Sequence, residues 1–191
     1  IGIMNGLWAN AIGRGGVIPI EVQFYLSNTL FELKLTGMQG DVMKESMSIA
    51  KTLAWSLTSS AKQISLVEKF DKTKIQGIHI HCPEGAVPKD GPSAGTAITV
   101  AIYSILNNKP IKNNVAITGE ITLQGDVTAI GGLDLKILGG MKANVTTFIF
   151  PKENENNYNK FKEKYDKDGF LDDITFIPVS NIKEVLKLVF A

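Results

Sequence analysis

The chain has 191 residues, of which 44% are hydrophobic and 20% charged, and its formal net charge is +1. These values fit one soluble globular domain with a full core, and they argue against an extended nucleic-acid-binding face. Cys82 is the only cysteine, which excludes an internal disulfide and favours a reducing compartment. No apolar run is long enough to span a membrane, and no G-x-x-x-x-G-K-[ST] phosphate-binding loop is present in the sequence.

Strand and helix patterns are mixed along the chain without strict alternation, which predicts an α/β fold with a mixed sheet. Strands are expected at 17–25, 30–35, 75–82, 115–118, 121–123, 127–130, 146–150 and 174–179. Helices are expected at 41–57, from Ser93 to about 107, at 134–142 and at 182–190, with a solvated helix-and-loop excursion at 152–173. Pro19 predicts an edge or a bulge for its strand, and Gly139 and Gly140 weaken the helix that contains them.

One serine stands in an unusual setting. The segment 88–95 reads Pro-Lys-Asp-Gly-Pro-Ser-Ala-Gly and is followed at once by an apolar pattern of helical spacing. Asp90 is a plausible cap and Pro92 fits a first turn, so Ser93 is predicted at a helix N-terminus. Free N–H groups there favour the oxyanion that forms when a serine attacks a carbonyl. The alternative interpretation is that Ser93 only helps to cap the helix.

A nucleophilic serine needs a base, and two histidines are candidates. His79 and His81 lie on one face of the strand 75–82, with Ile78, Ile80 and Cys82 on the other. They could pair with Ser93, or they could be hydrogen-bonding residues of a polar strand face. A His-x-His pair can also bind a metal, but the chain has no other histidine to complete a site.

Lys136 is the other candidate base. It follows Gly131 and Gly132 and lies among aliphatic residues. A lysine accepts the serine proton only if its pKa falls from about 10.4 to roughly 7–8, chiefly through desolvation. The alternative is that its ammonium group extends to water.

The segments 78–95 and 116–123, and 130–133 followed by Lys136, closely resemble the proteolytic domain of ATP-dependent Lon proteases. Order and spacing match, including the 43 positions from Ser93 to Lys136. The likeness covers almost the whole chain, including 40–46, and the form of segment 88–95 points to the classical soluble branch of the family. The resemblance implies one Lon-type proteolytic domain over 1–191.

The resemblance also implies a Ser-Lys dyad. Ser93 would be the nucleophile, and Lys136 the base that later protonates the leaving amine. Thr118 matches a threonine that helps to hold the catalytic lysine. Asp90 matches an acid that obstructs the site in inactive forms of the family.

Other expected roles are less direct. Glu21 aligns loosely with an acid near the dyad, and His79 and His81 would be supporting residues; ordinary strand polarity is the alternative for Glu21 and for Thr118. The sequence departs from the family at Asp134–Leu135, and an acid near Lys136 would raise its pKa. The Asn-rich stretch 154–159 is interpreted as surface variation.

For the whole protein, the resemblance implies an ATP-dependent serine endopeptidase that cuts unfolded or damaged proteins inside a six-membered ring. The chain is expected to be part of a longer protein in which a substrate-binding region and an ATPase module, with ATP and Mg, precede this domain. No cofactor, metal or membrane is expected here, and the compartment would be the cytoplasm or the mitochondrial matrix. Two alternatives stay open: a non-catalytic relative that binds peptide or nucleic acid, and a Ser-Lys hydrolase of small esters or amides.

Overall fold

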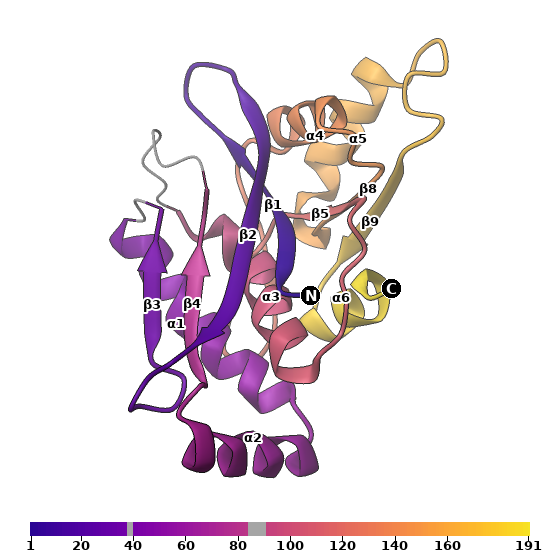
Figure 1. Cartoon of the computed structure of the whole chain (residues 1–191). Helices are drawn as coiled ribbons and strands as arrows, with labels where there is room; N and C mark the ends of the chain where they lie inside the picture. Colours follow the sequence, from indigo (N-terminus) through magenta and orange to yellow (C-terminus); the bar gives the residue numbers. More distant parts are fainter. Residues whose placement is uncertain (38–39, 84–90) are drawn as a thin grey trace.

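The computed structural model, drawn in Figure 1, describes residues 1–37, 40–83 and 91–191 and contains one large mixed sheet. Its strand order is β3-β4-β2-β1-β5-β8-β9. The bounds are β1 (Ile3–Ala9), β2 (Gly15–Tyr25), β3 (Leu33–Thr36), β4 (Gly77–His81), β5 (Val115–Ile117), β8 (Thr147–Pro151) and β9 (Thr175–Val179). From β1 to β9 the neighbours are parallel, whereas β2 runs antiparallel to β1 and β4. The predicted mixed α/β fold is confirmed.

Helices cover both faces of this sheet (Figure 1). The helices are α1 (Asp41–Leu57), α2 (Ser60–Thr73), α3 (Gly95–Asn107), α4 (Leu133–Lys142), α5 (Glu155–Tyr165) and α6 (Ile182–Val189). Alternate residues of β5 and β8 enter different cores: Ile117 and Ile149 pack with α1 and α3, whereas Ala116 and Phe148 pack with α4 and α5. No helix in the described part of the chain is long and apolar enough to cross a bilayer.

Two predictions about the first half of the chain need correction. Pro19 is not on an edge strand, since β2 lies between β4 and β1. Pro19 faces Asn5 of β1, but the pairing of β2 with β4 begins only at Glu21, so no ladder to β4 requires an N–H from Pro19. The predicted strand 30–35 is shorter, because Phe31 adopts a left-handed conformation with φ 54° and ends a turn.

The two glycines predicted to weaken α4 allow the helix to approach the sheet closely. A Cβ on Gly139 would lie 2.2 Å from the carbonyl carbon of Gly15 in β2, and a Cβ on Gly15 would lie 2.2 Å from the carbonyl oxygen of Leu135. The α4 and β2 backbones therefore touch with no side chain between them. This contact, together with Leu133 and Ile137 in the core, holds the helix that carries Lys136.

Gly139→Ala should destabilise the protein although alanine is the better helix former. Helix propensity alone predicts a gain of about 1 kcal/mol, whereas overpacking against the β2 backbone costs about 1–3 kcal/mol or more. Urea unfolding should therefore show a net loss. Gly131→Ala is the matched control, because a Cβ there meets nothing within 4 Å. A stabilised Gly139→Ala variant would show that the close approach of α4 is wrong.

Candidate active site

A pocket of about 500 Å³ lies where β1 and β5 end and where the first turns of α3 and α4 meet. Ser93 and Lys136 both line it. The remaining lining residues are Leu7, Trp8, Ala9, Asn10, Ile18, Met43, Gly91, Pro92, Ala94, Glu120, Ile130, Gly131, Gly132 and Leu135. The structure thus brings together the two residues predicted as nucleophile and base. They approach from helices on opposite faces of the sheet.

Backbone hydrogen bonds hold the turn that carries Ser93. This 3₁₀ turn (Pro92–Ala94) runs directly into α3, as predicted. The Gly119 N–H donates to the Ser93 carbonyl at 2.9 Å, and the Thr96 N–H and hydroxyl donate to the Gly119 carbonyl at 3.1 and 3.0 Å. A Cβ on Gly119 would lie 2.6 Å from a methyl carbon of Val127, so the absence of a side chain permits this pairing.

Lys136 is buried, with 4% of its surface exposed, and its Nζ donates a hydrogen bond to the Thr118 hydroxyl at 3.1 Å. Thr118 is fully buried and adjoins Gly119, which pairs with the Ser93 turn. Burial lowers the pKa of Lys136 from 10.5 to about 8, against the opposing effect of Glu120. An appreciable fraction of the side chain is therefore neutral near pH 7–8 and able to accept a proton.

The acid that acts on Lys136 was not predicted from the sequence. Asp134 was expected to raise the pKa of Lys136, but among the described residues the charge that raises it is that of Glu120, on β6 (Glu120–Ile121). Asp134 lies on the exposed side of α4 and does not line the pocket. Glu120 lies two residues after Thr118 and faces into the pocket.

Asn154 is a second residue that sequence reasoning missed. Interpreting it as surface variation is wrong, since only 3% of Asn154 is exposed. Its side-chain oxygen accepts from the Ile130 N–H at 2.9 Å, and its amide nitrogen donates to the Ile130 carbonyl at 2.8 Å. This double hydrogen bond fixes Ile130, which is followed by Gly131, Gly132 and then the start of α4. Asn154 therefore supports the pocket wall without lining it.

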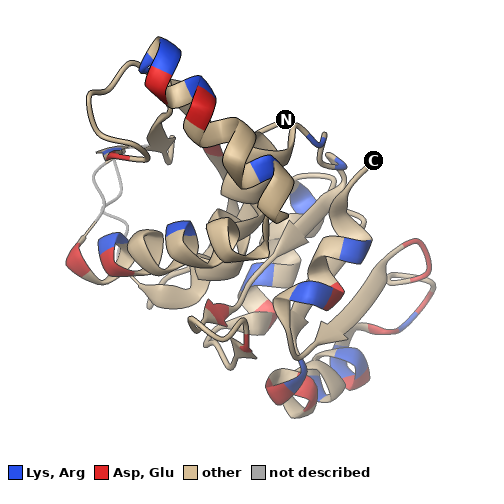
Figure 2. Cartoon of the chain, turned by 90° about the horizontal axis from the view of Figure 1, so that it is seen from below, with Lys and Arg blue, Asp and Glu red and all other residues tan. Residues whose placement is uncertain are grey.

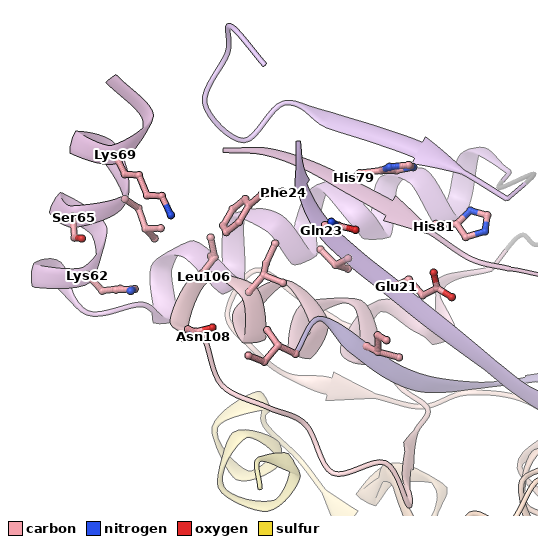
Figure 3. A pocket seen from close by; sticks show the side chains of 15 residues that line it. Glu21, Gln23, Phe24, Lys62, Ser65, Lys69, His79, His81, Leu106 and Asn108 are labelled. Carbon is pink, nitrogen blue, oxygen red and sulfur yellow. The ribbon is translucent and has the colours of Figure 1, made fainter. Parts of the chain in front are cut away.

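The predicted supporting residues Glu21, His79 and His81 lie in a different pocket of about 880 Å³, between α2 and the open end of the sheet (Figure 3). Ser93 and Lys136 do not line this pocket. Glu21 is three residues beyond Ile18, the β2 residue that lines the Ser93 pocket, which corresponds to roughly 10 Å along a strand. The structure thus does not bring these side chains to the Ser93 pocket. Asp90 lies outside the described residues.

The two histidines share one partner. The Thr36 hydroxyl lies 2.9 Å from Nε2 of His79 and 2.7 Å from Nδ1 of His81. Burial, Lys34 and His81 lower the pKa of His79. Within residues 1–37, 40–83 and 91–191, no group of three His, Cys, Asp or Glu side chains could hold a metal ion. The histidines therefore form a hydrogen-bonded polar face of β4.

Comparison with known proteins identifies the family. Residues 1–191 match the family described as the Lon protease (S16) C-terminal proteolytic domain. The chain belongs to this family. It is 45% identical over 160 residues to a Lon protease of Clostridium acetobutylicum, covering 84% of the chain and 20% of that protein. Similar Lon proteases come from Elusimicrobium minutum (40% over 190 residues; 100% and 21% covered) and Buchnera aphidicola (43% over 188 residues; 98% and 22%). The chain spans about a fifth of the length of these relatives.

Burial of Lys136 should appear in the pH dependence of stability. Between its folded pKa of about 8 and its unfolded value of 10.5, the unfolded chain binds more protons, so the free energy of unfolding rises with pH. Lys136→Met removes this contribution. Urea unfolding at pH 7 and pH 10 should show the parent gaining on the order of 2–3 kcal/mol relative to Lys136→Met. Equal pH dependence of the two proteins would contradict the lowered pKa.

Asn154→Asp tests the contact with Ile130. The variant keeps the size and the acceptor but loses the N–H donor to the Ile130 carbonyl and buries a charge. We expect a loss of about 1–3 kcal/mol in denaturant unfolding near pH 7. Asn156→Asp, at an exposed position of α5, is the control and should change stability by less than about 0.5 kcal/mol. Equal small effects in both variants would argue against the double hydrogen bond between Asn154 and Ile130.

Proposed function

We propose that the chain is a serine endopeptidase domain in which Ser93 and Lys136 form a catalytic dyad. The observation that carries this proposal is the shared pocket, which is lined both by the half-buried Ser93 and by a lysine whose pKa is lowered to about 8. Membership of a family of proteolytic domains supports peptide bonds as the substrate.

In this mechanism Lys136 Nζ takes the Ser93 hydroxyl proton while Oγ attacks the peptide carbonyl. The hydrogen bond to Thr118 occupies one of the two N–H groups of the neutral amine, which orients its single lone pair. The negative charge on the carbonyl oxygen is stabilised by the free N–H groups and dipole of the first turn before α3. Lys136 then returns its proton to the leaving amine, and a water molecule that it deprotonates hydrolyses the acyl-enzyme.

The alternatives are less well supported. A Ser-His pair is disfavoured because His79 and His81 line the other pocket. A nucleic-acid-binding relative needs a basic face, whereas the Lys and Arg positions are interspersed with Asp and Glu positions along the ribbon in Figure 2. A hydrolase of small esters would share the dyad, and only the substrate distinguishes it.

Three further proposals concern only the longer protein to which this chain would belong. That protein would cleave unfolded or damaged proteins, use ATP and Mg on a separate ATPase module, and assemble into a hexameric ring. The cytoplasm or the mitochondrial matrix is the proposed compartment. This domain itself would need no cofactor.

Cleavage of an unstructured protein by this domain tests the dyad. Activity of the parent should rise with a midpoint near pH 8, as Lys136 loses its proton. Ser93→Ala and Lys136→Ala should each lower the rate by a factor of 10³ or more, since the nucleophile and its base act as a unit.

The matched control is the pair His79→Ala and His81→Ala, which should keep most of the activity. Activity that survives Lys136→Ala but is lost in a histidine variant would replace the dyad with a Ser-His pair. Turnover of a short ester without cleavage of the protein would favour the small-molecule hydrolase.

A further inference from the structure

Glu120 holds a position that the dyad mechanism leaves unused. It directly follows Gly119, whose N–H binds the Ser93 turn, and its backbone pairs with Thr128 in the small β6–β7 hairpin, where β7 is Val127–Thr128. Its side chain is partly buried and lines the pocket of Ser93 and Lys136. Among the described lining residues, Glu120 and Lys136 are the only Asp, Glu, Lys, Arg or His. The part of the pocket wall that the structure describes therefore carries one acid and one base.

We propose that Glu120 is a positioning residue whose carboxylate holds the ammonium form of Lys136 in the pocket after the proton of Ser93 has been transferred. This proposal rests on the proposed dyad. It assigns to Glu120 a negative charge that acts on the ammonium group of Lys136, in addition to the charge of the oxyanion, while the two coexist.

The physical need follows from burial. Lys136 begins as a neutral amine and becomes a cation when it accepts the Ser93 proton, and a buried cation without a counter-charge is costly. Desolvation favours the neutral amine, whereas Glu120 favours the ammonium ion. Their balance leaves the lysine basic enough to take the proton and acidic enough to return it to the leaving amine. Without Glu120, the lowering of the Lys136 pKa by desolvation would not be opposed by this carboxylate.

Apart from Glu120, no charged residue on the other described elements lines the pocket with Lys136. The lining residues from β1 and β2 are uncharged, as are those from the Ser93 turn and α1. On α4 itself, the nearest acid is Asp134, which is exposed. Glu84, Lys89 and Asp90 fall outside the described residues, so Asp90 is included in the test.

The test compares Glu120→Gln with its matched control Asp134→Asn. Titration of Lys136 is followed by NMR of its ¹³Cε in a Ser93→Ala background, with assignment from Lys136→Met, so that this readout needs no activity. Glu120→Gln should shift the titration of Lys136 to lower pH, and Asp134→Asn should leave it unchanged. Activity is measured in protein that retains Ser93. There, Glu120→Gln should move the acidic limb of the kcat/KM profile to lower pH. It should also lower the plateau rate, because the amine of Lys136 is then a weaker base.

Several outcomes would overturn the proposal. An unchanged titration in Glu120→Gln would do so, as would a rate lowered by the same factor at every pH, which indicates a merely structural role. A shift in Asp90→Asn but not in Glu120→Gln would assign the counter-charge to Asp90. Failure of the proposed dyad would give a different result. The titration of Lys136 would still respond to Glu120→Gln, but cleavage would not depend on Ser93.

Discussion

Pairing of Gly119 with the Ser93 turn is the contact on which the site depends. Thr118, before Gly119, accepts a hydrogen bond from Lys136, and Glu120, after it, lines the pocket, so three consecutive residues link the Ser93 turn, Lys136 and the one acid among the described lining residues. The segment leaves the sheet at the end of β5, between the starts of α3 and α4. Because those helices lie on opposite faces, their N-termini can meet only beyond the strand ends. The fold thus creates the pocket where its two hydrophobic cores adjoin.

The chemistry of the pocket depends on a compromise between burial and charge. A lysine exposed to water would be protonated at neutral pH and useless as a base. Burial of Lys136 removes water from the amine, but complete desolvation without a polar partner would leave the amine with no defined orientation. Thr118 provides that orientation, and Asn154 holds the segment from which α4 begins. These contacts hold Lys136 in a buried position that is unfavourable for its charged form.

Sequence patterns predicted most strands, most helices and a helix start at Ser93, because periodicity and turn residues are local signals, but they did not predict β1, which lies inside the sheet. They missed α2, although Ser59 caps it, since Leu66 and Phe70 are its only buried hydrophobic residues and Ile64 is exposed. Asn154 and Glu120 were missed for a different reason. Asn154 bonds to Ile130, 24 positions away, and Glu120 shares a pocket with Lys136, 16 positions away, and only the folded chain brings these residues together. Glu21 was misplaced because resemblance does not specify distance along a strand.

Direct contact between α4 and the β2 backbone has a mechanical consequence. Side chains between a helix and a sheet act as adjustable spacers, and here Gly15 and Gly139 leave none. The β1–β2 hairpin and α4 must consequently move as one rigid body, with Lys136 fixed to it. The Ser93 turn rests instead on hydrogen bonds to a short loop. Because that loop also carries Thr118, the hydrogen-bond partner of Lys136, it links the Ser93 turn to this rigid body.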